Sequence, residues 1–562
     1  MTPPLQQKLV DSHPSSSSGK GALLVGTGIF LSRIVGLVRE RVLAYYLGNS
    51  MASAAFKAAL RIPNFLQNLF GEGVLSASFI PIYASLSGKK ENEEANLVAN
   101  AVFGLLLLAV AVLVSAGIFF TPLFIDVIAP GFQGETKILA IRLVRIIFPG
   151  TGLLVLSAWC LGILNSHRRF FISYTAPVLW SLAIIASLIL FGNSWVNNPS
   201  QTDLAITAGY GVVAGCLLQF GIQLPFVLKL LGKFKPNLAM ANRSVRQVLR
   251  SFGPVVLGRG VVQVSAYIDT AYASLISDRA LSALAYAQTL YLIPISLFGM
   301  AVSAAELPEM SQVSGTFEEV AQKIQARINT GLRRIAFFVI PSAVVFFFLG
   351  DVVGGALLQT GRFNSADTRY LWYLLMGSTC GLLASTMGRL YASAFYALKD
   401  TKTPLYFAAA RVTLTAVLAY WSAVKLPGEL GIPRELGGIG ITATTGFAAW
   451  IEFLLLRWKM GKRIGKTGLS KTHLTTLWSI AIFAALLGLG IKGELVKIYG
   501  ANLATSEWGS RFLPMPQLHP LLTAGAILIP FGMVYILLAT LFKIPEVGFV
   551  TKIINKNTKK FF

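Results

Sequence analysis

The fold of this chain is decided by SASFIPIYASLSG, residues Ser76–Gly88, because a related stretch, SAAELPEMSQVSG, aligns with it without gaps at Ser303–Gly315. Flanking segments repeat at a similar offset of about 230 residues: IPNFLQNLFG from Ile62 is echoed by IPISLFG from Ile293, and PGFQGET from Pro130 by TGRFNSADT from Thr360. Self-similarity at a nearly constant offset indicates two copies of one structural unit.

The composition places the chain in a lipid bilayer. Of its 562 residues, 54% are hydrophobic and only 13% are charged, well outside the range of soluble globular proteins. Apolar runs of about 18 or more residues recur from Ala22 onward, the length that a helix needs to cross ~30 Å of hydrocarbon. Because lipid offers the backbone no hydrogen-bond partner, these runs predict an all-α membrane protein.

Apolar windows and turn signals predict about fourteen transmembrane helices. Six spans form a first lobe, six a second, and two follow; they are predicted at 22–48, 53–86, 95–121, 135–165, 172–192 and 204–231, then 244–276, 280–313, 325–350, 366–397, 404–424 and 437–458, and finally 473–491 and 519–542. The domains are an N-terminal tail at 1–21, lobes at 22–232 and 233–460, a helix pair at 461–543 and a basic tail at 544–562. Since each lobe has an even number of spans, the repeat is parallel, and two such lobes flanking a cavity suit alternating access.

The distribution of charge argues against a nucleic-acid partner and against an enzyme. Lys and Arg number 48 against 24 Asp and Glu, but they lie between the spans rather than on one domain. Most loop cations fall on one side if both termini are cytoplasmic, as the positive-inside rule requires. None of the four histidines lies in the interior of a span and the three cysteines lie inside apolar runs, so the sequence predicts no catalytic site, no metal site and no cofactor.

Cations inside the first-lobe spans are the main functional signal. Each costs about 2.5 to 3.5 kcal/mol on insertion scales. They are Arg33, Arg39, Arg41, Lys57, Arg61, Lys137, Arg142 and Arg145, opposed deep in the lobe only by Glu40 and Glu72. A net positive cavity favours an anionic substrate, and the guanidinium fork suits pyrophosphate because it donates two hydrogen bonds at once. The alternative is that some of them snorkel to an interface or pair with the glutamates, which is favoured for Arg41, Lys57 and Lys137.

Three of these arginines are the strongest candidates for substrate binding. Arg33 and Arg39 lie about 9 Å apart along a helix, so both can border one cavity. Arg61 directly precedes an Ile-Pro-Asn segment, where proline frees backbone groups and bends the helix. The full predicted substrate-binding set is Arg33, Arg39, Arg61, Asn64, Glu72, Arg145 and Arg259, with Glu72 favoured as a partner for a neighbouring arginine rather than as a proton carrier.

The second span of each lobe is predicted to bend or break. At about 34 residues, span 53–86 is too long to cross a bilayer straight. Discontinuous helices line transport sites and supply hinges, although passive kinking against neighbours is an equal alternative for any one residue. The predicted hinge residues are Pro63, Gly71 and Gly73 in the first lobe and Pro294 and Gly299 in the second.

A buried carboxylate marks the second lobe. Asp269 lies about 15 Å along the helix from Arg259, so the two cannot pair directly. Asp269 therefore needs a cation from another helix, a bound metal ion or a proton.

Two stretches, SRIVGLVRERVLAYYLG at Ser32–Gly48 and AAFKAALRIPNFLQNLFGEGVLSASFIPIYASL at Ala54–Leu86, together with APGF at Ala129 and ILNSHRRF at Ile163, resemble the MurJ (MviN) family of lipid II flippases, within the multidrug/oligosaccharidyl-lipid/polysaccharide exporter superfamily. The resemblance covers at least the first twelve spans. It implies a protein of the bacterial inner membrane that carries lipid II, the undecaprenyl-pyrophosphate-linked peptidoglycan precursor, from the cytoplasmic to the outer leaflet. The implied partners are lipid II, membrane lipids and, as a candidate, the cell-wall synthesis machinery.

The family's substrate-binding positions carry over only in part. Its span-one arginines match Arg33 and Arg39, and its basic residue before the proline of span two matches Arg61. Three positions depart from the family pattern: Ala54 stands in place of an acid, and Gln67 and Thr289 each stand in place of an arginine. Arg145, Arg259 and Arg389 are the residues that could compensate.

The resemblance also bears on ion coupling and on the lipid tail. In some family members an acid at the position of Asp269 helps to bind sodium with Asp or Asn from span eleven, where this chain has Arg411 instead. We therefore expect Arg411 to replace the ion by pairing with Asp269 in at least one conformational state. The last two spans lie outside the repeat, so we expect them to form an apolar groove for the polyprenyl chain.

Two other functions stay open from the sequence. The first is a flippase for another polyprenyl-linked oligosaccharide. The second is a cation-coupled drug exporter of the MATE type, which should present carboxylates to its cavity where this chain presents arginines. A purely structural membrane protein would leave the arginines within the spans unexplained.

Overall fold

The computed structural model describes residues 17–71, 74–75, 78–89, 91–167, 169–194, 199–499 and 519–548. Within these ranges every extended regular element is a helix, which confirms the all-α fold class. The α-helices are α1 Ser17–Leu47, α2 Met51–Phe70, α4 Ile80–Gly88, α5 Asn92–Phe119, α6 Thr121–Ile128, α7 Gly134–Ser166, α8 Phe170–Ser194, α9 Gln201–Leu231, α10 Arg243–Ile276, α11 Asp278–Pro294, α12 Ala301–Ser311, α13 Phe317–Leu358, α14 Ser365–Ala397, α15 Lys402–Tyr420, α16 Leu426–Leu430, α17 Gly437–Ile464, α18 Lys471–Tyr499 and α19 Pro520–Leu541. Two π-helices, η1 Ile295–Met300 and η2 Trp421–Lys425, and a 3₁₀-helix, η3 Arg434–Leu436, connect some of them.

Each predicted span coincides with a helix or with consecutive helices in the described residues. Ten helices or continuous helical runs there are long and apolar enough to cross a membrane. The long helices α1, α2, α10 and α14 are not among the ten, and they are the ones that carry Arg39, Arg61, Arg259 and Arg389. The count of fourteen membrane-crossing helices therefore stays a prediction.

The chain folds into two compact units. The first comprises 1–43, 59–124 and 139–260, and the second comprises 44–58, 125–138 and 261–562. The end of α1 and the start of α2 belong to the second unit because they pack on α11, where the Ser282 hydroxyl donates to Ser53 at 2.8 Å and the Lys57 ammonium lies 4.4 Å from the Tyr286 ring. The predicted lobes at 22–232 and 233–460 thus describe the repeat and do not coincide with these units.

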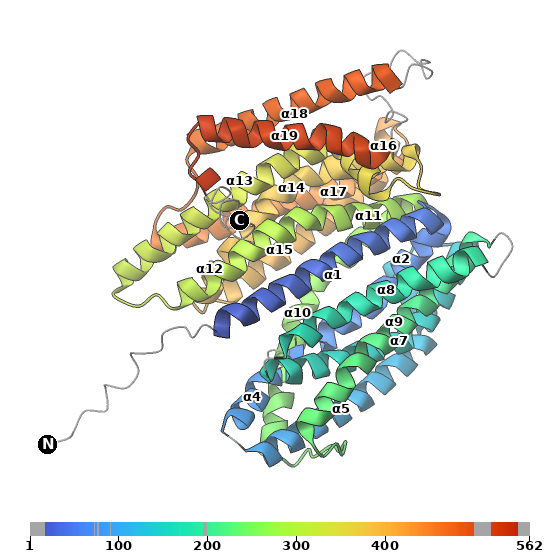
Figure 1. Ribbon diagram of the computed structural model, residues 1–562, viewed down its shortest axis with the longest axis vertical. Helices are drawn as coiled ribbons and strands as arrows, with labels where there is room; N and C mark the ends of the chain where they lie inside the picture. Colours follow the sequence, from blue (N-terminus) through green and yellow to red (C-terminus); the bar gives the residue numbers. More distant parts are fainter. Residues whose placement is uncertain are drawn as a thin grey trace, which may run out of the picture. The chain divides into compact units, whose positions relative to one another are not determined.

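The first unit has a core centred on Trp159 of α7. This side chain is fully buried, its indole N–H donates to the Ala99 carbonyl at 3.1 Å, and its ring lies 4.8 Å from that of Phe103. The helices α4, α5, α7, α9 and α10 all contribute to the same apolar cluster. Helices α8 and α9 pack along one another in this unit (Figure 1).

The second unit is organised around α14, which packs against α11, α12, α13 and α17. Helices α14 and α17 come so close that a Cβ at Gly381 would lie 2.3 Å from the Cα of Gly446. Only glycine permits this approach, because a side chain would have to enter the opposing backbone.

The second span of each lobe is interrupted, as the sequence predicts. Helix α2 ends at Phe70 and Gly71 follows in a bend, before Val74, Leu75 and Ser78 are helical again, whereas α11 passes through the π-helix η1 into α12. Gly299 lies in η1, where a Cβ would come within 2.2 Å of the Thr386 Cγ2. The two lobes thus interrupt the corresponding span by different means, a break in one and a π-helical segment in the other.

The two C-terminal helices pack on each other and on α13 (Figure 1). Here the sequence interpretation needs a correction, because it ended spans at 350 and 491. Both helices continue further, and Lys492 of α18 forms an ion pair with Asp351 of α13 in which both side chains are buried. These two charged residues lie just beyond the predicted span ends, and their ion pair holds α18 to α13.

The glycine contact between α14 and α17 predicts that two glycine-to-alanine substitutions on α14 differ in their effect on stability. Gly381→Ala should lower the free energy of unfolding by about 1 to 3 kcal/mol, because the new methyl group meets the Gly446 backbone. Gly388→Ala is the control, since a Cβ there has no neighbour within 4 Å, and it should be neutral or stabilising by up to ~1 kcal/mol. Thermal unfolding of the detergent-solubilised chain measures both, and equal effects would contradict the close packing.

Candidate functional site

Arg39 of α1 is held by a cluster of side chains in the first unit. Its guanidinium donates to Glu40 at 2.8 Å and to the Ser181 hydroxyl of α8 at 3.3 Å. It also lies 4.7 Å from the centre of the Trp180 ring, a cation–π contact. The predicted phosphate ligand is therefore oriented and neutralised by Glu40 in this conformation.

The other first-unit candidates are less enclosed. Arg33 of α1 and Arg145 of α7 are exposed, and no described residue accepts a hydrogen bond from either. Arg61 of α2 is half-buried, and Asn64, about one turn further along, is exposed. Arg33 and Arg145 are thus available to an anion, and they lie on two different helices.

Some predicted residues cannot be placed. Glu72 and Gly73 lie outside the described residues. Arg259 and Pro63 lie within α10 and α2, without a description of their side chains. Gly71 directly follows the end of α2, and Pro294 ends α11 at the start of η1, so both border an interruption.

Asp269 and Arg411, the pair predicted from the sequence, each contact another residue in this conformation. Asp269 of α10 is buried and accepts a hydrogen bond from the Thr445 hydroxyl of α17 at 3.4 Å. Arg411 of α15 donates instead to Glu452 of α17 at 3.0 Å. Pairing of Asp269 with Arg411 stays a prediction for another conformation.

Charged and hydroxyl groups of the second unit gather around Tyr291 of α11. Its hydroxyl donates to Ser385 of α14 at 3.2 Å, and it lies within electrostatic range of Arg389, Arg411 and Asp269. Arg389 is exposed, and no described residue accepts a hydrogen bond from it. Arg389 therefore lies near the Arg411–Glu452 ion pair without taking part in it.

Two further polar groups serve packing. Glu306 of α12 is buried and accepts hydrogen bonds from Arg327 at 3.1 Å and Arg334 at 3.4 Å, both of α13. In the first unit, His167 lies 3.0 Å from the Tyr83 hydroxyl. Burial, and then the charge of the nearby Arg169, lower the pKa of His167, so its imidazole is neutral at pH 7 and adds no cation.

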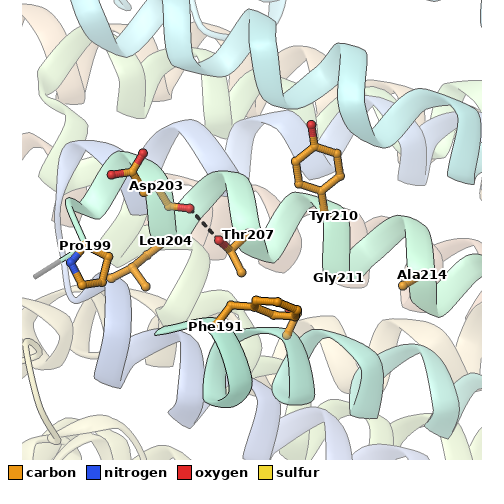
Figure 2. A pocket seen from close by; sticks show the side chains of 9 residues that line it. Phe191, Pro199, Asp203, Leu204, Thr207, Tyr210, Gly211 and Ala214 are labelled. Atoms are coloured by element: carbon orange, nitrogen blue, oxygen red, sulfur yellow. Dashed lines mark hydrogen bonds between the residues drawn. The ribbon is translucent and has the colours of Figure 1, made fainter. Parts of the chain in front are cut away.

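Two cavities in the described part of the chain are apolar. One, of about 370 Å³, lies in the second unit between α11, η1, α13 and α19, and its walls include Ile293, Phe298 and Phe531. The other, of about 420 Å³, lies between α8 and α9, where Figure 2 shows Phe191 facing the segment of α9 that carries Thr207. Asp203 at its end is already engaged, because it forms a capping box with Ser200. With no cation in its lining, this second cavity does not suit a phosphate.

Glu452 is the site residue that the sequence interpretation missed. It is an isolated acid within the predicted span 437–458, so the argument that singled out Asp269 applies to it equally. The sequence interpretation considered only Asp269 as a partner for Arg411, whereas in this conformation Arg411 pairs with Glu452.

Comparison with known proteins identifies relatives over most of the chain. The family model described as "Lipid II flippase MurJ" matches residues 43–506, a range that begins after Arg33 and Arg39. The "Lipid II flippase MurJ" of Burkholderia cenocepacia is 30% identical over 450 residues, covering 79% of this chain and 84% of that protein. The "Probable lipid II flippase MurJ" of Rickettsia prowazekii is 31% identical over 435 residues, covering 76% of this chain and 80% of that protein.

Solved structures agree with these relatives. A structure described as "Lipid II flippase MurJ, inward closed conformation" matches with a TM-score of 0.72 and 25% identity, covering 92% of this chain and 98% of that one. An inward-facing MATE family transporter of the MOP superfamily matches with a TM-score of 0.59 and 16% identity, over 78% of this chain and 98% of that one. The second likeness shows the fold alone.

Two double-mutant cycles distinguish the partners of Arg411. In the Arg411→Met and Glu452→Gln cycle we expect a coupling energy of about 1 kcal/mol or more, because the ion pair is partly buried. The cycle with Asp269→Asn in place of Glu452→Gln should give less than half of that value. The unfolding midpoint of each full-length variant in detergent provides the measurement. A larger coupling with Asp269 would restore the pair predicted from the sequence.

Proposed function

The chain belongs to the MurJ family of lipid II flippases, and on that premise we propose how its residues carry lipid II across the inner membrane. The protein is a multi-pass flippase of that membrane, and lipid II is its substrate. The observation that carries this assignment is the family match over 43–506. It is joined by two relatives at 30% and 31% identity over more than three quarters of the chain.

The direction and topology of transport follow as proposals. Lipid II moves from the cytoplasmic to the outer leaflet by alternating access, with both termini of the chain in the cytoplasm. The excess of loop cations on one side supports this orientation. The cell-wall synthesis machinery, which consumes the flipped precursor, is a candidate partner.

The pyrophosphate of lipid II is the group that the first-unit arginines fit. Arg33 and Arg145 have no carboxylate partner among the described residues, so an arriving anion meets their full charge. Arg39 reaches the anion by exchanging its bond to Glu40 for one to phosphate, while Trp180 and Ser181 keep the guanidinium oriented. Arg61 and Asn64 lie within α2 and complete the proposed contact surface, with Glu72 and Arg259 as the remaining members.

The interrupted spans supply the movement in this proposal. Pro63 lies within α2 and Gly71 directly follows its end, while Pro294 and Gly299 lie at and within η1. Gly73 belongs to the same proposed hinge and lies outside the described residues. A π-helical segment has a wider hydrogen-bond register than an α-helix, so it can reorganise with a small loss of backbone bonding. The two interruptions are therefore proposed as hinges.

The polyprenyl chain is proposed to occupy the cavity beside α19. Its lining is made of aliphatic, aromatic and proline side chains apart from Ser342, whose hydroxyl already donates to the Phe338 carbonyl. A cavity of about 370 Å³ accommodates only part of a long prenyl chain, so the rest must extend into lipid.

Ion coupling stays a prediction from the sequence. With Arg411 in the span where sodium-binding relatives have acidic or amide ligands, we propose that transport needs no sodium. The Arg411–Glu452 pair supports this, because it places a fixed cation beside the Asp269 region in this conformation.

Removal of single arginines tests the proposed pyrophosphate contacts. Arg39→Ala and Arg61→Ala should each lower lipid II flipping at least tenfold in reconstituted vesicles, and lysine at either position should restore it only partly. Lys137→Ala is the matched control with near-normal activity, because Lys137 already pairs with Asp126 at 2.5 Å.

The double variant Arg39→Ala/Glu40→Ala separates transport from stability. Arg39→Ala alone removes the ion pair that Arg39 makes with the buried Glu40, which can lower protein abundance. The double variant should recover abundance and stay inactive. Recovery of flipping would show that Arg39 only neutralises Glu40.

A photoreactive residue in α19 tests the prenyl cavity. Placed at Leu528, which lines the cavity, it should crosslink the prenyl chain of lipid II. Placed at Met533, an exposed residue of the same helix outside the lining, it should capture bulk phospholipid. Equal capture of lipid II at both positions would contradict a specific groove.

A further inference from the structure

The last turns of α17 and the loop that follows them line a third cavity, rich in cations, that the transport proposal does not use. It has a volume of about 510 Å³ and lies entirely within the second unit. Its lining residues are Leu454, Arg457, Trp458, Gly461, Lys462, Lys466 and Thr467. Three of them are cations and none is acidic.

The cavity exists because the loop after α17 folds back and is fastened at several points. The Arg457 Nε donates to the Thr467 carbonyl at 3.0 Å, and the Tyr391 hydroxyl of α14 donates to the Thr467 hydroxyl at 2.9 Å. Helix α13 holds the same loop from another side, since its Gln325 donates to the Lys466 carbonyl at 2.6 Å. The site is therefore built before any ligand arrives.

The backbone at Gly468 adapts the loop to this fold. Its φ of +141° lies in a region that residues with a side chain rarely adopt, and a Cβ there would lie 2.5 Å from the Arg457 Nη2. Its N–H donates to Asn329 of α13 at 2.9 Å. Glycine thus allows the loop to close over the guanidinium.

The positive charge in the cavity is not neutralised by the described part of the chain. Arg457, Lys462 and Lys466 have no carboxylate partner there, whereas the neighbouring Arg463 pairs with Asp400 at 3.0 Å. The Lys462 ammonium lies 3.9 Å from the centre of the Trp458 ring, which forms one wall. The chain therefore neutralises the cation beside the cavity and leaves those inside it available.

One side of the cavity is apolar and faces outward. Leu454 is 51% exposed and Trp458 is 54% exposed, near the end of a helical run long and apolar enough to cross a membrane. Tryptophan is enriched where a membrane helix leaves the hydrocarbon, and basic residues follow it at the head-group level. Along α17, Leu454 comes first, Arg457 and Trp458 are adjacent, and Lys462 lies about one turn further, so apolar and cationic side chains are both available to one phospholipid.

We propose that this cavity binds the head group of an anionic glycerophospholipid. Arg457 and Lys462 contact the phosphate, Lys466 closes over it from the loop, and the acyl chains run along Leu454 and Trp458. Basic pockets at the cytoplasmic ends of transmembrane helices recognise anionic lipids through this combination of charge and apolar surface. A soluble phosphate would gain nothing from the exposed Leu454 and Trp458, which favours a lipid as the ligand.

Native mass spectrometry of the full-length protein with added phosphatidylglycerol measures this binding. We expect Lys462→Gln/Lys466→Gln to weaken phosphatidylglycerol binding about tenfold or more, because two interfacial cations are lost. The control Lys459→Gln/Lys471→Gln removes the same charge from exposed residues outside the lining and should leave binding unchanged. An equal loss of phosphatidylglycerol binding in the two double variants would show that the effect comes from general surface charge and would overturn the proposal.

A second measurement distinguishes the source of the phosphate. Phosphatidylglycerol with brominated acyl chains should quench part of the tryptophan fluorescence, and Trp458→Phe should lose that part. Glycerol phosphate should not compete. Competition by glycerol phosphate, or displacement by undecaprenyl pyrophosphate at equal concentration, would assign the cavity to a soluble anion or to the transport substrate and would overturn the proposal.

Discussion

The interior of this protein depends on the cost of holding charge away from water. A charged side chain in hydrocarbon is costly unless it reaches an interface or a partner of opposite charge. Within the described residues this requirement is met by pairs between helices: Asp351 with Lys492, Arg411 with Glu452, and Glu306 with Arg327 and Arg334. Each pair also fixes one helix against another, so the electrostatic requirement and the packing of the second unit have the same solution.

Some arginines take no part in such pairs and are therefore candidates for binding an anion. Arg33, Arg145 and Arg389 are exposed and no described residue accepts a hydrogen bond from them, in a protein that elsewhere neutralises its buried charge. Arg39 stands between the two groups, because Glu40 neutralises it while Trp180 and Ser181 orient it. A pyrophosphate supplies the negative charge that can neutralise these arginines. A lipid-linked pyrophosphate therefore suits the molecule better than a cationic drug.

The second spans of the lobes and helix α14 differ in how continuous and how tightly packed they are. The second span of each lobe is interrupted, by the break between α2 and α4 and by the π-helix η1. The rigid counterpart is α14, which glycine contacts such as Gly381 on Gly446 draw tightly against α17. In the proposed transport cycle the interrupted spans rearrange while the α14–α17 contact stays fixed.

The sequence by itself determined the class of protein, the all-α fold, the repeat and the interruption of both second spans, because hydropathy, helix length and proline placement act locally along the chain. It also indicated where charge enters the spans. Only the tertiary structure decided which charges meet: Glu452 rather than Asp269 receives Arg411, and Lys492 enters a helix that the sequence interpretation had ended one residue earlier. The physical reason is that a charge in a membrane can be neutralised by any opposite charge that packing brings within a few ångströms. The sequence shows which charges are present, but only the packing of the helices selects the partner.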